Sequence, residues 1–309
     1  MQDWWEATFP KGRQTLTISD FQGYPVQIAY GSIGTGKPLF LLHGVGSWSY
    51  CWRNCIKPLS QNFQVICVDA KGYGFSEKPL NRREESGHQI IELKRIIKAL
   101  VDKPVTIVGE SLGGLTGLGL AETDPDLIER LIVINVPIFT QRLPHWGMNL
   151  LSIAPLEIVN IIDNLRLTNI FAPFVREILG RERRQVLFNP KMLKQEDIYW
   201  ISYPFIEISG TLTKAAEELQ IAAQAIANWH LKKPNLLSQI QNNLHQITCP
   251  TLILWGEHDT WFDKEDGEKL HQCIPDSLFQ VLPNCGHDAA YGAADRVTKA
   301  ILDFCLPIK

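Results

Sequence analysis

The sequence predicts an α/β fold: a mostly parallel sheet of about eight strands, helices on both faces of the sheet, and a helical cap inserted after the sixth strand. Three observations lead to this prediction. Short apolar segments alternate with helical patterns over residues 14–136. The alternation stops near residue 137 and returns near residue 251. Short apolar strands that alternate with helices are typical of a parallel sheet covered on both faces.

Six of the expected strands precede the interruption. Their ranges are 14–18, 25–30, 38–42, 64–68, 105–108 and 131–136, with helices expected over 50–59, 88–101 and 112–121. Apolar residues at helical spacing, among them Ile90, Leu93 and Ile97, predict the helix over 88–101. After the interruption we expect strands over 251–255 and 278–282 and helices over 264–272 and 290–304.

The interruption divides the chain into two predicted domains. Residues 1–136 and 230–309 form the core domain, and residues 137–229 form the cap. The cap segment has helical patterns and many aromatic residues. We expect most of these aromatics to form the cap's own small core. The alternative is that some of them line an apolar substrate pocket.

The composition argues against several classes of protein. The chain has 309 residues and a net charge of −3, with 45% hydrophobic and 20% charged residues, as in a globular protein with a sizeable core. A slightly acidic chain does not favour nucleic-acid binding. The dense basic run over 181–184 contains Glu182, so we expect a solvated helix face. No apolar run approaches the roughly 20 residues of a membrane span.

Cysteine usage and motif spacing bear on location and cofactors. The seven cysteines lack C-x-x-C spacing, which argues against a zinc site or a redox motif and fits a reducing, cytoplasmic setting. The first ten residues lack a basic segment followed by an apolar core, so we expect no signal peptide. We also expect no metal and no organic cofactor, because ligand clusters and dinucleotide-binding glycine patterns are not seen.

Residues 105–114 predict a nucleophile. They read Val-Thr-Ile-Val-Gly-Glu-Ser-Leu-Gly-Gly, which is an apolar strand, a sharp turn and the start of a small-residue helix. Such a turn strains the backbone of Ser111 and lifts its oxygen above the end of the sheet. Gly109 and Gly113 are expected there because a side chain at either position would collide with neighbouring backbone. The N–H of Leu112, at the helix start, is free to bind an oxyanion.

A second loop completes the predicted oxyanion hole. The segment His43-Gly-Val45-Gly follows the strand over 38–42. We assign the second oxyanion N–H to Val45, because the loop after this strand supplies that group beside a nucleophile of this kind. We expect His43 to brace the loop, since a histidine directly at a strand end has little room to reach a substrate.

A serine hydroxyl needs a base, and the base needs an acid behind it. His287 is the predicted base, because it lies in a loop after a strand and near the end of the chain. Asp259 is the predicted acid, in the loop after the strand over 251–255. The rival acids are Glu257, which we expect to be solvated, and Asp288, which we expect to point away. Asn135 stands where some proteins of this kind place the acid.

These segments together resemble the α/β-hydrolase superfamily over essentially the whole chain. The motifs are HG at 43–44, D-x-x-G-x-G-x-S at 69–76, G-x-S-x-G at 109–113, G-x-x-D at 256–259 and G-H at 286–287. The order Ser111, Asp259, His287 is the order that this superfamily uses. Segment 69–76 carries Lys71 where arginine is usual, and we interpret it as a structural turn beside the nucleophile.

Residues 43–54 resemble two subgroups of the superfamily. One comprises epoxide hydrolases and haloalkane dehalogenases, which need an aspartate nucleophile where this chain has Ser111. The other comprises pheophytinase-like hydrolases, which use serine but usually have asparagine where this chain has Glu110. The resemblance therefore implies the serine branch of the superfamily.

We predict a serine hydrolase that cleaves a carboxylic ester of a small to medium apolar molecule through an acyl-enzyme. Two alternatives stay open: the same triad could act on another bond (a thioester, amide or C–C bond, or by perhydrolysis or lyase chemistry), or the chain is a ligand receptor on a hydrolase scaffold. The predicted partner is a small-molecule substrate. The predicted substrate contacts are Trp48, Trp146, Trp200, Trp261 and Phe262.

Overall fold

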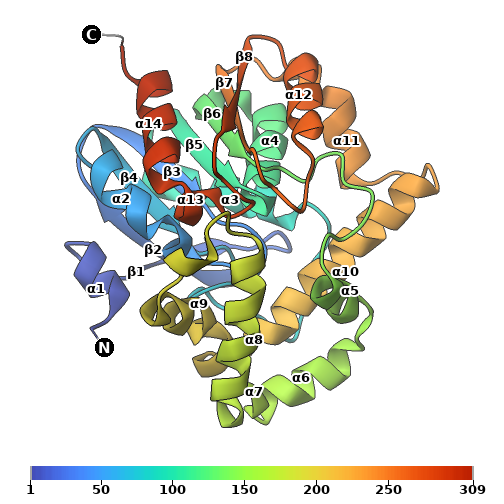
Figure 1. The fold of residues 1–309 in the computed structure, drawn as a ribbon. Helices are drawn as coiled ribbons and strands as arrows, with labels where there is room; N and C mark the ends of the chain where they lie inside the picture. The colour runs from blue at the N-terminus through green and yellow to red at the C-terminus, as the bar shows by residue number, and fades with distance from the viewer. Residues whose placement is uncertain (1, 308–309) are drawn as a thin grey trace.

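The computed structural model describes residues 2–307 (Figure 1). Eight strands form one sheet in the order β1-β2-β4-β3-β5-β6-β7-β8. The strands are β1 (Gln14–Ser19), β2 (Pro25–Ile33), β3 (Lys37–Leu42), β4 (Phe63–Val68), β5 (Val105–Glu110), β6 (Ile128–Ile134), β7 (Thr251–Gly256) and β8 (Ser277–Leu282). β2 runs antiparallel to β1 and β4, and the pairings from β4 to β8 are parallel. The predicted mostly parallel sheet is confirmed.

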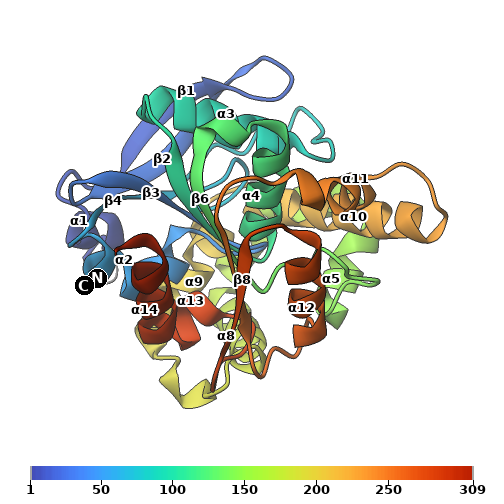
Figure 2. The ribbon, with the colours of Figure 1, turned by 90° about the horizontal axis from the view of Figure 1, so that it is seen from above.

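Helices cover both faces of this sheet. The helices outside the insertion are α1 (Trp4–Thr8), α2 (Arg53–Leu59), α3 (His88–Leu100), α4 (Leu112–Thr123), α11 (Leu236–Asn243), α12 (Lys264–Cys273), α13 (Ala289–Gly292) and α14 (Ala294–Cys305). Figure 2 shows α3, α4, α11 and α12 on one side of the sheet and α2, α13 and α14 on the other.

The strand pattern explains why both faces are covered. In β3, Phe40 and Leu42 belong to one buried cluster, whereas Leu39 and Leu41 belong to the other. Alternate side chains of a strand point to opposite faces, so a fully apolar strand buries itself only between two helical layers. The central strands therefore specify the layered architecture, and their parallel ends meet at one edge of the sheet.

The predicted element boundaries differ from the structure in a few places. The helix expected over 290–304 is two helices, because the backbone of Ala293 leaves the helical region at φ −139°. The helix expected over 50–59 begins with a 3-10 turn at Ser49–Trp52. The sequence analysis missed α1, whose first turn is capped by Asp3. Short helices such as α1 depend on caps and tertiary contacts more than on periodicity.

Helices fill the inserted segment between β6 and α11. They are α5 (Trp146–Ile153), α6 (Leu156–Asn164), α7 (Leu167–Ile170), α8 (Ala172–Gln185), α9 (Gln195–Glu207) and α10 (Thr211–His230), and we call this group the cap. Figure 1 shows the cap below the carboxyl ends of the parallel strands. The division into a core domain and a cap domain stays a prediction. Within residues 2–307, no helix combines the length and apolar character that a membrane span needs.

Candidate active site

The turn between β5 and α4 holds Ser111 in a strained conformation. Its backbone has φ 54° and ψ −120°, and its N–H donates to the Ile134 carbonyl at 2.8 Å. A Cβ on Gly109 would lie 2.4 Å from the Gly113 carbonyl carbon, and a Cβ on Gly113 would lie 2.5 Å from the Leu42 oxygen. Only glycine fits at either position, as the sequence predicts. The two close contacts explain how strand and helix force the turn.

The loop after β3 passes directly over Ser111. A Cβ on Gly44 would lie 3.1 Å from the Ser111 Cβ. His43 braces this loop, because its Nδ1 donates to the Gly44 carbonyl at 2.9 Å and its Nε2 accepts the Ala70 N–H at 3.1 Å. Burial lowers the pKa of His43, which keeps the ring neutral for both contacts. His43 therefore has the bracing position that we predict.

The two residues that we predict as oxyanion donors lie beside Ser111. Leu112 is the first residue of α4, where a backbone N–H has no partner within the helix. Within residues 2–307, the Val45 N–H donates no backbone hydrogen bond. Val45, Leu112 and Ser111 line one cavity together. An oxyanion hole needs two N–H groups close to the nucleophile, and the positions of Val45 and Leu112 are compatible with that role.

His287 and Asp259 form a hydrogen-bonded pair. The His287 Nδ1 donates to the Asp259 Oδ2 at 2.8 Å. The other carboxylate oxygen accepts the backbone N–H groups of Trp261 at 2.8 Å and Phe262 at 3.2 Å. Burial opposes the charge on His287, but the Asp259 carboxylate outweighs it and raises the pKa of His287. The pair fixes the tautomer that leaves Nε2 free to accept a proton.

The two rival acids, Glu257 and Asp288, have other partners than His287. The Glu257 side chain is 46% exposed and accepts the Asn284 N–H, so it is solvated as expected. Asp288 pairs with Arg183 of α8 at 3.0 Å. The expectation of a solvated basic face over 181–184 is therefore wrong for Arg183, whose side chain is only 19% exposed. The partner comes from a segment 105 residues away, which local charge patterning does not reveal.

Asn135 has a role that sequence reasoning missed. It follows β6 with φ 49°, a conformation that asparagine tolerates better than most residues. Its Nδ2 donates to the His287 carbonyl at 2.7 Å, and its Oδ1 accepts the Gly256 N–H at 2.8 Å. Asn135 thereby joins the loops that carry the acid and the base. The signal in the sequence was an asparagine at a strand end.

Glu110 places a second carboxyl group beside the nucleophile. Its Oε1 accepts the Ala290 N–H at 2.9 Å, and the side chain lines the cavity that contains Ser111. Burial and the nearby Asp288 carboxylate raise the pKa of Glu110 to about 8. At neutral pH this group is therefore mostly protonated, and its O–H can donate a hydrogen bond.

Two cavities meet at Ser111. The larger, of about 370 Å³, also contains His287 and extends into the cap between α5 and α8. It is mostly apolar but has Arg183 and Asp288 at one side. The smaller, of about 110 Å³, is lined mainly by apolar residues of α4, α10 and α11 such as Leu115. The site can thus hold two parts of a substrate, one in each cavity.

The structure separates the predicted aromatic contacts into two groups. Trp146 and Trp261 line the larger cavity, and Trp261 and Phe262 line the smaller one. Trp48 and Trp200 line neither, because the Trp48 indole N–H donates to the Trp200 carbonyl at 3.0 Å inside a buried aromatic cluster. We therefore correct the prediction for Trp48 and Trp200 from substrate contact to packing between cap and core.

The D-x-x-G-x-G-x-S segment is a structural turn behind this site, as the sequence analysis expects. The Asp69 carboxylate accepts the Ser49 N–H and the Phe75 N–H, each at 2.8 Å. A Cβ on Gly74 would lie 2.0 Å from an Asp69 oxygen, which explains the second glycine of the motif. The Ser76 hydroxyl donates to the Asp69 carbonyl at 2.6 Å and closes the turn.

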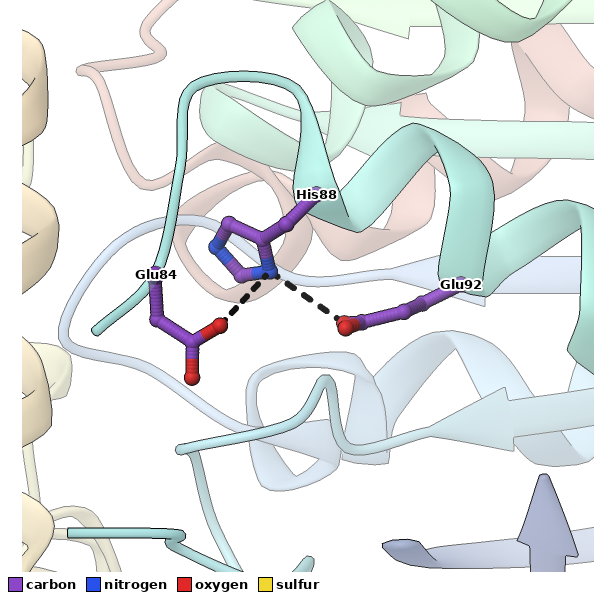
Figure 3. Close-up of side chains that lie close together, drawn as sticks. All are labelled: Glu84, His88 and Glu92. Atoms are coloured by element: carbon purple, nitrogen blue, oxygen red, sulfur yellow. Dashed lines mark hydrogen bonds and ion pairs between the residues drawn. The ribbon is translucent and has the colours of Figure 1, made fainter. Parts of the chain in front are cut away.

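A cluster of Glu84, His88 and Glu92 has the donor atoms of a metal site within 4.8 Å of one another (Figure 3). The Lys71 ammonium already lies 2.7 Å from Glu84 and 2.5 Å from Glu92. Burial opposes charge on His88, but Glu218 and Glu92 outweigh it and raise its pKa to about 10. In this structure these residues therefore form an ion-pair network.

This network connects the core to the cap. From α10, Lys214 pairs with Glu84 at 3.0 Å and with Glu217 at 2.8 Å, and Glu218 pairs with His88 at 3.2 Å. All of these side chains are buried or nearly so. Buried charges are tolerated only when they are paired in this way.

The chain belongs to the alpha/beta hydrolase fold family, which it matches over residues 37–294. It is 28% identical to a 2-hydroxy-6-oxo-6-(2'-aminophenyl)hexa-2,4-dienoic acid hydrolase of Metapseudomonas resinovorans, over 90% of this chain and 87% of that one. It is 28% identical to a pimeloyl-[acyl-carrier protein] methyl ester esterase of Nitrosospira multiformis (90% and 98%) and 26% identical to human epoxide hydrolase 4 (87% and 72%). The protein is thus an enzyme of this superfamily, with a small-molecule substrate.

Proposed function

We propose that the protein is a serine hydrolase that cleaves a carboxylic ester of a small to medium apolar substrate, with Ser111, His287 and Asp259 as its triad. The main support for this proposal is that the strained Ser111 and the hydrogen-bonded His287 line one cavity. A nucleophile, an oriented base and unpaired N–H donors at one point are the parts that acyl transfer needs.

The proposed reaction has two halves. The His287 Nε2 removes the Ser111 proton while the serine oxygen attacks the ester carbonyl, and the N–H groups of Val45 and Leu112 stabilise the oxyanion. The imidazolium then donates its proton to the leaving alcohol, and an acyl-enzyme remains. Water, activated by His287, hydrolyses this acyl-enzyme and regenerates the serine.

The apolar lining of both cavities supports an apolar substrate. The relative from Nitrosospira multiformis is described as a methyl ester esterase, which supports an ester as the bond. The seven cysteines are unpaired within residues 2–307, and this supports a reducing, cytoplasmic setting.

Hydrolysis of a C–C bond next to a ketone is a second candidate. The relative from Metapseudomonas resinovorans is described as a hydrolase of an oxo-dienoic acid. The Arg183–Asp288 pair beside the larger cavity offers a polar environment that a purely apolar ester would not use. Both reactions begin at a carbonyl and need the same oxyanion hole, so the substrate decides between them.

Labelling with a fluorophosphonate probe and turnover of a soluble substrate panel test the proposal. We expect the probe to label Ser111, and we expect Ser111→Ala to lower kcat on short p-nitrophenyl esters by about 10⁴- to 10⁶-fold. Circular dichroism shows whether the variant is folded. Near-wild-type turnover by folded Ser111→Ala contradicts the assignment. Turnover of a 2-hydroxy-6-oxodienoate with little turnover of esters favours the second candidate, and labelling without any turnover favours a receptor.

A further inference from the structure

Glu110 differs from the other ionisable side chains that line the larger cavity, because it lacks an ionic partner. The other ionisable side chains of the lining form pairs, which are Arg183–Asp288 at 3.0 Å, His145–Glu182 at 2.6 Å and His287–Asp259 at 2.8 Å. Within residues 2–307, the Glu110 carboxyl group forms no ion pair and accepts one hydrogen bond, from a backbone N–H. An unpaired carboxyl group is therefore part of the cavity wall beside the nucleophile.

The two oxygens of this carboxyl group have different surroundings. Oε1 accepts the Ala290 N–H at 2.9 Å. Oε2 has no hydrogen-bond partner within residues 2–307, yet it is not one of the oxygens that are fully buried without a partner. The Asp288 Oδ1, in contrast, is such an oxygen. Oε2 therefore keeps contact with open space, and the larger cavity is the space that Glu110 lines.

The ionisable groups around Glu110 come from three neighbouring segments. They are Cys285, His287 and Asp288 before α13, Arg183 in α8, and Cys51 and Cys55 in the 3-10 turn and α2. Burial raises the pKa of all three thiols, so these stay neutral. Burial of Glu110 itself and the Asp288 carboxylate outweigh Arg183 and His287, and they raise the pKa of Glu110 to about 8. The carboxyl group is therefore mostly protonated at neutral pH.

The proton of Glu110 is directed to the cavity. Because Oε1 accepts an N–H, the proton lies on Oε2, and a protonated carboxyl group has one O–H donor. Asp288 does not accept this proton, since its Oδ2 binds Arg183 and its Oδ1 has no hydrogen-bond partner within residues 2–307. The cavity therefore contains a hydrogen-bond donor without a protein acceptor, and leaving such a donor unpaired under a bound ligand costs free energy.

We propose that Glu110 selects esters that carry an acceptor oxygen, such as an ether or keto oxygen, a few bonds from the scissile carbonyl. The proposal rests on the proposed function, which places the carbonyl carbon at Ser111, the next residue. Beyond that oxygen the substrate is apolar, because Leu151, Val175 and Leu179 line the cavity farther into the cap. A plain alkyl chain would leave the Glu110 O–H unpaired, and a site with an unpaired polar group discriminates against such a ligand.

Two pairs of matched esters test the selection. p-Nitrophenyl methoxyacetate and p-nitrophenyl butanoate differ by an ether oxygen in place of a methylene in the acyl part, and 2-methoxyethyl butanoate and butyl butanoate differ likewise in the alcohol part. We expect the pair whose varied part occupies the larger cavity to show a preference for the oxygen in kcat/KM. Glu110→Met should lower this kcat/KM ratio by about fivefold, whereas Glu110→Gln keeps a donor and should retain it. Comparing variants on the same pair cancels the intrinsic reactivity of the esters.

The kcat/KM ratio of a pair also has a pH dependence of its own. Titration of His287 changes both rates of a pair equally and cancels in the ratio. Glu110 loses its donor proton above a pKa of about 8, so the wild-type ratio should fall between pH 6.5 and pH 9. Glu110→Gln should keep the same ratio at both pH values. Glu257→Gln, an exposed carboxyl change outside both cavities, is the control and should behave like the wild-type protein.

Binding of two ketones separates this proposal from the proposed function. 2-Methoxyacetophenone and butyrophenone differ by the same replacement of a methylene, and neither is an ester. We expect the Kd ratio of the two ketones, measured by ligand-observed NMR, to favour the methoxy ketone about fivefold more in Ser111→Ala than in Ser111→Ala/Glu110→Met.

The outcomes distinguish the two proposals. If no ester is turned over but the ketone ratio differs as expected, the proposed function fails and the selection by Glu110 stands. Ester turnover with equal ratios in wild type, Glu110→Gln and Glu110→Met, and with equal ketone ratios, overturns the Glu110 proposal alone. The wild-type pH profile needs no variant, so an unchanged ratio from pH 6.5 to pH 9 in both ester pairs contradicts the proposal even if Glu110→Met does not fold.

Discussion

The carboxyl end of the sheet and the cap enclose the same cavity, but backbone contacts fix the first and side-chain packing holds the second. A Cβ on Gly109 or Gly113, in the turn between β5 and α4, would lie within 2.6 Å of backbone atoms. The cap glycines Gly147 and Gly180 would meet only side-chain atoms, at 3.3 Å and 3.2 Å. Side chains can move to accommodate a methyl group, whereas strands and helices cannot. The difference places the proposed catalytic groups on the rigid side and leaves the cap free to vary with the substrate.

The largest expected effect is a loss of kcat at the carboxyl end of the sheet. Asp259→Asn should lower kcat by about 10³- to 10⁴-fold, because an amide stabilises the wrong tautomer of His287. Glu257→Gln is the matched control and should change kcat little, since Glu257 is half exposed. Ester turnover of both purified variants decides the matter. A dead Glu257 variant beside an active Asp259 variant would mean that the acid is misassigned.

The same pair predicts a pH dependence. His287 acts as a base only when it is neutral, so the rate should rise with pH through its raised pKa. Asp259→Asn removes the carboxylate that raises this pKa, so the midpoint of the residual activity should move to lower pH. A pH–rate profile of kcat/KM for both proteins measures this shift, and an unchanged midpoint would speak against the pairing.

The next effect concerns the ion-pair network between the core and the cap. Lys214→Met should lower the free energy of unfolding by about 3–5 kcal/mol, because it leaves the buried Glu217 without its cation. Lys299→Met is the control, since Lys299 and Asp303 form an exposed pair on α14, and it should cost less than about 1 kcal/mol. Urea unfolding measures both. Equal losses in the two variants would show that the buried network does not hold the cap to the core.

A smaller effect comes from Glu110, whose pKa is about 8 in the folded protein against an ordinary 4.5. Between these values the folded protein holds a proton that the unfolded chain has lost, so this group makes stability fall as pH rises, by up to ~1.4 kcal/mol per pH unit. Glu110→Gln cannot titrate and should show a shallower fall between pH 5 and pH 8. Urea unfolding at both pH values, with Glu257→Gln as the exposed control, measures the slopes. Equal slopes in wild type and Glu110→Gln would show that the titration of Glu110 does not cause the fall in stability.

The two regions also differ in how far sequence predicts them. Short motifs predict the turn at Ser111, the Asp69 turn and the bracing position of His43, because their geometry depends on contacts within or next to the motif. The Arg183–Asp288 pair joins residues 105 positions apart, and no local pattern encodes it. The Glu110 carboxyl group accepts the N–H of Ala290, which is 180 positions away.

The cap illustrates a second limit. An apolar stripe at helical spacing predicts that a helix face is covered, but it does not say by what. The inward residue Val159 and the outward residue Ile161 look alike in the sequence. Trp146 and Trp200 were both predicted to contact substrate, yet only Trp146 lines the cavity. Packing against α10 and the core decides which way a cap side chain points, and only the structure shows that packing.

The smallest expected effect concerns which cavity holds the growing end of a substrate. Each added methylene that is buried contributes about 0.8 kcal/mol, which corresponds to a three- to fourfold gain in kcat/KM per carbon until the cavity is full. If the acyl chain occupies the larger cavity, Trp146→Ala should flatten this trend and Leu236→Ala, which lines the smaller one, should not. The reverse result assigns the acyl chain to the smaller cavity. Because both variants keep the triad, probe labelling of Ser111 should be unchanged in each. A trend that neither variant alters would mean that the cap and α11 do not select the substrate, and the division between a rigid catalytic side and a variable binding side would fail.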